Sequence, residues 1–165
     1  MKSLAVAFTG PSDSGKTTLI LKVAALLKRD YTLAIVKNDP SDKAHFDVEG
    51  KDSWKFSQTG AEVVVTSPTR TTLFSKRHKT LDEIIAMLGN FDFLLVEGLK
   101  TLPLPRIAVF REKLNESYFD CSDAIAVDET VNLNDYTLPS TIAILDLNNP
   151  EQVVAWIMQN AKKVR

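Results

Sequence analysis

The sequence has little of several features that mark particular protein classes. It has one cysteine, Cys121, so it forms no internal disulfide, and we expect a reducing compartment. No apolar run approaches the roughly 18 residues of a membrane helix, and no small-residue cleavage site follows Met1, so neither a membrane span nor a signal peptide is expected. The formal net charge of −1 argues against nucleic acid or an anionic membrane as an electrostatically held partner. These absences predict a cytoplasmic protein.

Histidine is also scarce, with only His45 and His78 in the chain. Neither has partner ligands at a useful spacing, so no transition-metal site is expected. Apolar residues, in contrast, are plentiful, since 44% of the 165 residues are hydrophobic and 25% are charged. A chain of this size and composition buries one continuous core, which predicts a single globular domain over residues 1–165.

Residues 10–17 carry the most informative motif, G-P-S-D-S-G-K-T, which fits the phosphate-binding loop pattern G-x-x-x-x-G-K-[ST]. An apolar strand-like run, 4–8, precedes it, and apolar residues at helical spacing follow it. Glycines let backbone N–H groups turn inward around a polyphosphate, and the N-terminus of the helix adds further donors. Lys16 would reach the β- and γ-phosphates, and Thr17 would hold Mg²⁺. The motif therefore predicts nucleotide binding.

Further apolar runs alternate with helical patterns along the rest of the chain. Strands are predicted at 4–8, 31–36, 61–66, 70–74, 91–98, 106–110, 124–127 and 141–145. Helices are predicted after the loop to about Arg29, around Trp54 behind a cap at Asp52 and Ser53, from a capping box at Thr80, and from Pro150. Residues 37–51 lack apolar periodicity and predict a long loop. Together these patterns predict an α/β fold of the P-loop NTPase type, with three α/β/α layers and a mainly parallel sheet flanked by helices.

A bound triphosphate requires Mg²⁺, which prefers one or two carboxylates together with water and phosphate oxygens. Glu97 ends a buried apolar run and is the best candidate for holding the metal or the attacking water. Asp47, in the long loop, is the second acidic candidate, although loop aspartates are commonly solvated. Lys16 and Glu97 are thus the candidate catalytic residues, and Thr17, Asp47 and Glu97 the candidate metal ligands.

Basic residues at predicted strand ends and in loops are candidates for a rim that binds a second phosphate-bearing molecule: Lys51, Arg70, Lys100, Arg106 and Arg111. No arginine finger or glutamine is evident to position an attacking water, so slow hydrolysis is expected. The Asn-Lys-x-Asp motif that recognises guanine is absent, because Lys37-Asn38-Asp39 has the wrong order. Asp128 and Asp146 directly follow predicted strands and could accept hydrogen bonds from guanine, or could be turn residues. The base stays open at this point.

Four segments resemble the molybdopterin-guanine dinucleotide biosynthesis protein B family: G-P-S-D-S-G-K-T-T-L at 10–19, F-D-V-E-G-K-D-S at 46–53, G-A-E-V-V-V-T-S-P-T-R at 60–70 and D-F-L-L-V-E-G-L-K at 92–100. P-R-I-A-V-F-R at 105–111 and A-I-A-V-D at 124–128 follow in the family's order and spacing. Arg106 stands where a lysine is common in the family. The first segment is generic, whereas G-K-D-S with L-V-E-G-x-K is specific.

The resemblance implies a P-loop GTP-binding protein, a slow GTPase at most, that assists the enzyme joining GMP to molybdopterin. It implies that the GTP phosphates are bound by residues of the loop and the helix start: Ser12, Asp13, Ser14, Gly15, Lys16, Thr17 and Thr18. The loop motif adds Gly10 to the candidate nucleotide-binding residues, and the position after a predicted strand adds Asp128. It supports Asp47 and Glu97 as Mg²⁺ residues. The implied partners are the molybdopterin guanylyltransferase and a second copy of the chain as a homodimer, and molybdopterin is a further candidate ligand.

Two other functions fit the same residues. A P-loop small-molecule kinase would need an acceptor site and an arginine-rich lid, for which the short basic run 76–79 is the nearest candidate. A binding adaptor would hold nucleotide or cofactor and hand it over with no useful hydrolysis. The sequence separates this adaptor from a slow GTPase only weakly.

Overall fold

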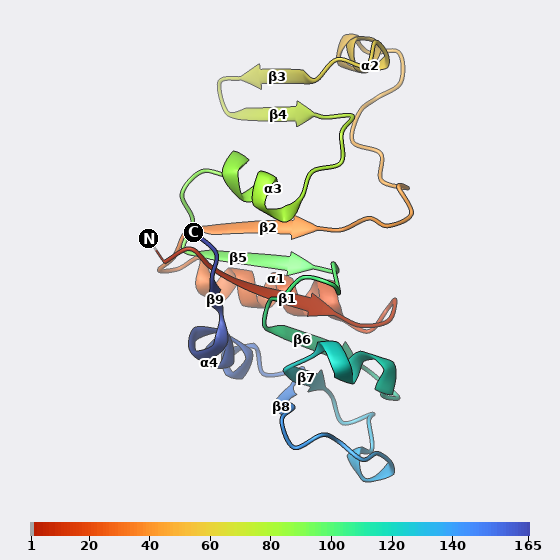
Figure 1. Ribbon diagram of the computed structural model, residues 1–165, viewed down its shortest axis with the longest axis vertical. Coiled ribbons are helices and arrows are strands. Elements are labelled where there is room, and N and C mark those ends of the chain that lie inside the picture. The colour runs from red at the N-terminus through yellow and green to blue at the C-terminus, as the bar shows by residue number, and fades with distance from the viewer. Residues whose placement is uncertain (1) are drawn as a thin grey trace. The chain divides into compact units, whose positions relative to one another are not determined.

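The computed structural model describes residues 2–165, which form two compact units (Figure 1). The larger unit contains the described residues up to Asn38 together with Asn90–Arg165. The smaller unit is Asp39–Gly89. The expectation of one domain over residues 1–165 stays a prediction, and each unit is described below by itself.

A sheet of seven strands forms the larger unit, in the order β2-β5-β1-β6-β7-β8, with β9 pairing with β1. Every pairing in this sheet is parallel except that of β9, which is antiparallel. The strands are β1 (Leu4–Thr9), β2 (Leu33–Lys37), β5 (Phe93–Glu97), β6 (Arg106–Phe110), β7 (Ala124–Val127), β8 (Ala143–Asp146) and β9 (Lys162–Lys163). All but the last fall within or beside predicted strands.

One face of this sheet packs against two helices, α1 (Lys16–Leu27) and α4 (Pro150–Asn160) (Figure 1). Alternate residues of β1, such as Val6 and Phe8, lie in the same buried cluster as Leu19 and Val23 of α1 and Val153 of α4. Because the side chains of a strand alternate between its two faces, the residues between them point to the other face. The helices bury the first face, as the periodicity predicts.

The opposite face is covered near β6 and β7 by short 3₁₀ helices and loops. Phe110 and Ile125 lie there in a second buried cluster, against which Tyr118 and Leu133 pack. Those two side chains come from η1 (Glu116–Cys121) and η2 (Leu133–Asp135), which no sequence pattern predicted. A mostly parallel sheet buried on both faces confirms the predicted α/β fold of the P-loop NTPase type.

The pairing register brings functional candidates to one edge of the sheet. Phe8 of β1 pairs with Glu97 of β5, which in turn pairs with Lys37 of β2. All three strands run the same way, so the loop after β1 and the carboxylate that ends β5 lie at the carboxyl edge, where ligands bind in such sheets. At the opposite edge Asp92 accepts hydrogen bonds from the backbone N–H groups of Lys2 and Thr32, so this aspartate has a structural role.

The smaller unit contains α2 (Asp52–Gln58), the antiparallel hairpin of β3 (Val63–Ser67) and β4 (Arg70–Phe74), and α3 (Leu81–Met87). The hairpin confirms the strands predicted at 61–66 and 70–74. Thr80 and Glu83 form the predicted capping box of α3. The predicted cap of α2 is wrong, because Lys51 is its N-cap residue, without a side-chain cap, and Asp52 is already helical.

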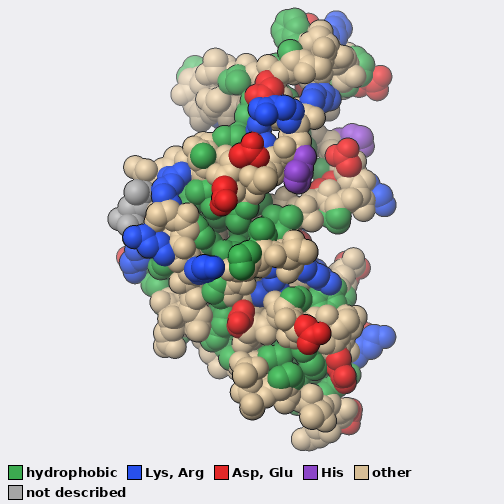
Figure 2. Space-filling view, viewed as in Figure 1, with side chains coloured by type: hydrophobic (Ala, Val, Ile, Leu, Met, Phe, Trp, Pro, Cys, Tyr) green, Lys and Arg blue, Asp and Glu red, His purple; other side chains and the backbone are tan. Residues whose placement is uncertain are grey.

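Among the described residues, no helix has the length and apolar character needed to cross a membrane. Figure 2 shows one face of the molecule, on which basic and acidic side chains are scattered and neither sign forms a broad patch. This distribution agrees with the formal net charge of −1. Any anion-binding site must therefore be built locally.

Candidate functional site

The loop between β1 and α1 has a backbone that only a few residue types tolerate. Gly10, Asp13 and Gly15 have φ angles of 138°, 59° and 92°, and Gly15 is the N-cap residue of α1. A Cβ at Gly10 would lie 2.4 Å from the carbonyl oxygen of Val109, so glycine is required where the loop passes β6. Left-handed residues of this kind turn successive N–H groups toward a common centre and so favour an anion.

Lys16 bends back over this loop. Its ammonium donates hydrogen bonds to the carbonyl oxygens of Gly10, at 3.0 Å, and of Pro11. Burial lowers the pKa of Lys16 from its usual range, the negative charge of Glu97 opposes that shift, and Lys37 adds to it. Because the Lys16 ammonium is partly desolvated, a nearby anion such as a phosphate would stabilise its charged form.

The side-chain hydroxyl of Ser14 is a buried polar group within this loop. Its side chain is buried, with the residue 5% exposed, and its hydroxyl oxygen has no hydrogen-bond partner among the described residues. Leaving a buried polar group unpaired costs roughly 1–3 kcal/mol, so such groups call for an explanation. A phosphate oxygen seated in the loop would satisfy this hydroxyl. The residues present therefore fit a nucleoside triphosphate.

Glu97 lies at the end of β5 with its side chain 17% exposed. One of its carboxylate oxygens lies 3.3 Å from the ammonium of Lys37. Its charge also acts on Lys16, so the loop lysine and this carboxylate share one electrostatic environment. The described residues contain no cluster of three or more histidine, cysteine or acidic side chains suited to a metal. Glu97 and the exposed Thr17 would thus hold Mg²⁺ only together with phosphate oxygens and water, as this ion prefers.

Asp128, the candidate for guanine, is already fully engaged. Its side chain is 3% exposed, and one oxygen accepts a hydrogen bond from Arg111 Nε at 2.9 Å. The other oxygen accepts hydrogen bonds from the backbone N–H and the hydroxyl of Thr130. Bonds from Thr130 and then Arg111 hold the pKa of Asp128 below its usual range despite burial. Direct contact with a base would require this carboxylate to exchange partners, so that role stays a prediction.

The hydrogen bond to Asp128 holds the Arg111 side chain beside the phosphate loop. A Cβ built on Gly15 would lie 3.8 Å from Arg111 Cδ, so the arginine packs against the N-terminus of α1. A small cavity of about 60 Å³ opens here, lined by Gly15, Thr18, Leu19, Lys22, Arg111, Leu147 and Asn148. It has room for the edge of a ligand that extends from the phosphate loop.

Sequence reasoning missed three residues of this cavity: Lys22, Leu147 and Asn148. Two signals could have found them. Lys22 is four residues after Thr18 and so lies on the same side of α1. Leu147 and Asn148 directly follow β8, at the carboxyl edge where ligands of parallel sheets bind.

Asp47 belongs to the smaller unit. One carboxylate oxygen accepts hydrogen bonds from the backbone N–H of Val48, at 2.8 Å, and from the hydroxyl of Ser53, at 2.9 Å. The other oxygen is buried and has no hydrogen-bond partner within the described part of the chain. An unpaired buried carboxylate oxygen is compatible with a metal ligand. The role of Asp47 at a shared Mg²⁺ site stays a prediction.

The predicted basic rim is wrong for Arg106. Its side chain is 1% exposed, and its guanidinium donates to the carbonyl oxygens of Gly98, Leu99 and Leu102, at 2.9, 2.9 and 3.1 Å. Arg106 therefore fixes the backbone that follows Glu97 and offers nothing to an external anion. Lys100 is exposed, with its ammonium 3.6 Å from the ring centroid of Tyr118. Lys51 and Arg70 lie in the smaller unit.

Comparison with known proteins gives one consistent answer. A protein of Methanocaldococcus jannaschii named for a molybdopterin-guanine dinucleotide biosynthesis adapter role is 31% identical over 133 residues, which is 76% of this chain but only 56% of that protein. The adapter protein of that name from Haemophilus influenzae is 28% identical over 90% of this chain and 84% of its own length.

The fold is also that of a solved relative. The crystal structure of Bacillus subtilis MobB covers 98% of this chain and 99% of that one, with a TM-score of 0.75 at 21% identity. The family model of molybdopterin guanine dinucleotide synthesis protein B matches residues 5–129, which include the phosphate loop, Glu97 and Asp128. The chain therefore belongs to the family of molybdopterin guanine dinucleotide synthesis protein B.

Proposed function

We propose that this protein is a Mg²⁺-dependent GTP-binding adapter, with slow hydrolysis, that acts where GMP is joined to molybdopterin. Nucleotide binding is supported by the loop between β1 and α1. There the buried Ser14 hydroxyl has no hydrogen-bond partner in the described part of the chain, and the Lys16 ammonium lies over the loop carbonyls. The names of the relatives supply the pathway. Its protein partner would then be the molybdopterin guanylyltransferase.

Each group of the loop has a role in this proposal. Lys16 and the N–H groups at the start of α1 hold the β- and γ-phosphates. Bound Mg²⁺ supplies charge neutralisation on those phosphates, and Thr17 and Glu97 hold it directly or through water. Asp128 supports the nucleotide through Arg111, which flanks Gly15 and the small cavity. The sequence offers no evident arginine finger or glutamine to position an attacking water, which favours slow turnover.

Glu97→Gln tests the hydrolytic part. Removing the charge weakens the metal site, so we expect GTP hydrolysis to fall by roughly tenfold or more while GTP affinity changes by less than about threefold. Phosphate release and calorimetry on the same preparations measure both. Glu151→Gln, at an exposed glutamate in the first turn of α4, is the matched control. An unchanged hydrolysis rate in Glu97→Gln would favour the adaptor without useful hydrolysis, and phosphate transfer to an added acceptor would favour the kinase.

We also propose that the protein is a homodimer joined through the smaller unit. Val64 and Leu73 of the β3–β4 hairpin are 59% and 37% exposed, and Phe56 of α2 is 60% exposed. Val64 pairs with Leu73, so both side chains lie on one face of the hairpin. An apolar hairpin face of this kind is a common site of association. A second copy of the chain is the occupant that the family resemblance implies.

Val64→Asp places a charge in the centre of that face and should convert a dimer into a monomer. Sedimentation equilibrium measures the change. Arg29→Asp, an exposed substitution in the larger unit, should leave the dimer intact. A wild-type protein that sediments as a monomer would remove this part of the proposal.

A further inference from the structure

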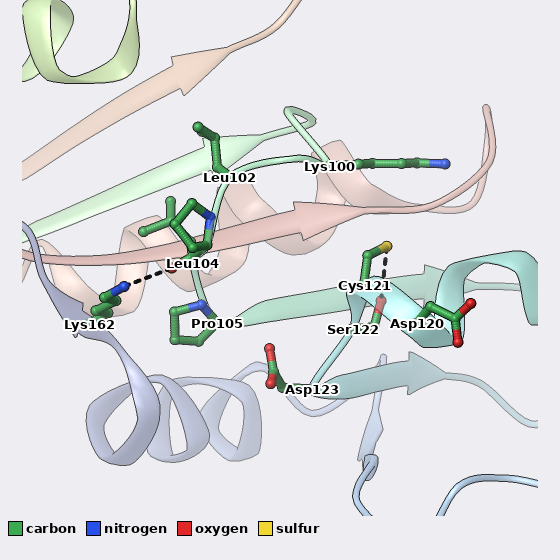
Figure 3. Close-up of a pocket in the computed structure, with 10 residues that line it drawn as sticks. Lys100, Leu102, Leu104, Pro105, Asp120, Cys121, Ser122, Asp123 and Lys162 are labelled. Carbon is green, nitrogen blue, oxygen red and sulfur yellow. Dashed lines mark hydrogen bonds between the residues drawn. The ribbon is translucent and has the colours of Figure 1, made fainter.

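A second, larger cavity lies in the larger unit, away from the phosphate loop (Figure 3). Its volume is about 490 Å³, within the range of roughly 300–1,000 Å³ of small-molecule sites. One wall is the segment Lys100–Pro105 between β5 and β6, and the other is Asp120–Asp123, from the end of η1 to the start of β7. Lys162 of β9 completes the lining. The nucleotide proposal uses none of these residues.

Hydrogen bonds to the backbone hold both walls. The buried guanidinium of Arg106 donates hydrogen bonds to the carbonyl oxygen of Leu102 in the first wall. It also donates to those of Gly98 and Leu99, which directly precede that wall. Lys162 Nζ donates to the carbonyl oxygen of Pro103 at 3.1 Å, as Figure 3 shows. The backbone N–H of Arg106 donates to Asp123 Oδ2 at 2.9 Å, which ties the second wall to β6. A cavity held in this way is formed before a ligand arrives, so binding does not have to order the protein.

The side chains at its two ends differ in what they recognise. In Figure 3, Lys162 lies at one end, Asp123 nearer the middle, and Lys100 and Asp120 toward the other end. Lys162 offers hydrogen-bond donors to the groove, and the carboxylate of Asp123, one oxygen of which accepts from the Arg106 N–H, offers acceptors. That pair complements the keto oxygen, ring N–H and amino group that pterins and guanine share. Lys100, exposed and charged, is suited to a phosphate group at the other end.

The charges of the lining residues also argue against a general binding site for small anions. The lining carries Lys100 and Lys162 but also Asp120 and Asp123, so its formal charge is balanced. A simple anion would gain little from such a lining. Leu102, Pro103 and Pro105 add apolar surface for the flat part of a ligand. The preferred ligand is therefore a flat heterocycle with N–H donors that also carries a phosphate.

The direction of the groove agrees with such a ligand. Lys100 follows Glu97 by three residues, so it enters the groove from the carboxyl edge of β5, the same edge as the phosphate loop after β1. Asp123 directly precedes β7 and so belongs to the amino edge. A phosphate on Lys100 would thus lie toward the nucleotide side of the sheet.

We propose that this groove binds a pterin monophosphate, with the pterin edge at Asp123 and Lys162 and the phosphate at Lys100. The inference rests on the proposed function, because molybdopterin is a pterin that carries a phosphate. It assigns that molecule a site separate from the phosphate loop. Both substrates of the dinucleotide-forming step would then be held by one adapter.

The test uses neopterin monophosphate, whose pterin ring is fluorescent, titrated into the full chain without nucleotide. We expect saturable quenching, with neopterin lacking the phosphate binding at least tenfold more weakly. Lys100→Ala should weaken binding of the phosphorylated probe tenfold or more and leave GTP affinity unchanged. Lys16→Ala should do the reverse, and Lys28→Ala, at an exposed lysine after α1, should change neither. Circular dichroism of each variant confirms that it folds.

Competition separates the two ligands that share the same edge. Inorganic phosphate should not displace the probe, and GMP should displace it at least tenfold less well than unlabelled neopterin monophosphate. Equal displacement by GMP would reassign the groove to guanine nucleotides and overturn the pterin assignment. GTP binding without any probe binding would overturn this inference alone, whereas probe binding without GTP binding would overturn the proposed function alone.

Discussion

Replacing Arg106 by methionine is expected to lower the free energy of unfolding by about 3 kcal/mol or more. Methionine fills a similar space but donates no hydrogen bonds, so the carbonyl oxygens of Gly98, Leu99 and Leu102 lose their donor. Each buried group left unpaired costs roughly 1–3 kcal/mol, partly relieved where water reaches the loop. Burial lowers the pKa of Arg106, which shows that its charge is also desolvated in the fold. The methionine variant no longer carries this desolvation cost. The net loss of stability is therefore smaller than the summed contributions of the three hydrogen bonds.

Urea unfolding of Arg106→Met, Arg106→Lys and Arg29→Met measures this effect. Lysine keeps a charge and donors but not the planar fork, so it should fall between wild type and methionine. Arg29 is exposed beyond α1 and should change stability by less than about 0.5 kcal/mol. GTP hydrolysis by Arg106→Lys should also decrease, because the bonded loop directly follows Glu97. A methionine variant as stable as wild type would show that the loop does not depend on the guanidinium.

Replacing Lys16 by alanine is expected to weaken GTP binding by roughly tenfold to a hundredfold. Hydrogen bonds to charged groups contribute about 1.5–3 kcal/mol, and the lost ammonium is a cation that bends over the loop. The stability of the protein should change much less than its affinity, because burial already disfavours the Lys16 charge in the free protein. Calorimetry with GTP and Mg²⁺ gives the affinity, and thermal unfolding without nucleotide gives the stability.

Lys28→Ala is the control, since this lysine lies at the other end of α1. Its affinity for GTP should equal that of wild type. If Lys16→Ala bound GTP as tightly as wild type, the loop after β1 would not be the phosphate site, whatever its sequence pattern.

Much of the larger unit follows from local patterns. Apolar runs such as 93–96 are buried on both faces, and a run of this kind is typical of a central parallel strand. The phosphate loop is recognisable because its glycines meet backbone requirements that few other residues meet, as the 2.4 Å approach at Gly10 illustrates. Glu97 was placed correctly at the sheet edge, because a carboxylate that ends a buried strand has to emerge where the strand does.

What the sequence did not predict depends on contacts between distant residues. Nothing in the sequence near Arg106 distinguishes a buried guanidinium bound to carbonyls from an exposed one. The bond from Arg111 to Asp128 spans 17 residues, so the sequence did not show that this candidate base ligand has an arginine partner within the protein. The strand β9 is only two residues long and forms because β1 offers it a free position. Asp52 fits the composition of a cap, but Lys51 holds the extended backbone that a cap requires.

The nucleotide itself provides the most direct test of the central claim. We would measure the affinity of the wild-type protein for GTP and for ATP by calorimetry, with Mg²⁺ in both titrations. The account predicts a preference for GTP of tenfold or more, which corresponds to about 1.4 kcal/mol. Equal affinity, or a preference for ATP, would contradict a guanine-specific adapter and would favour a kinase with an acceptor still to be found.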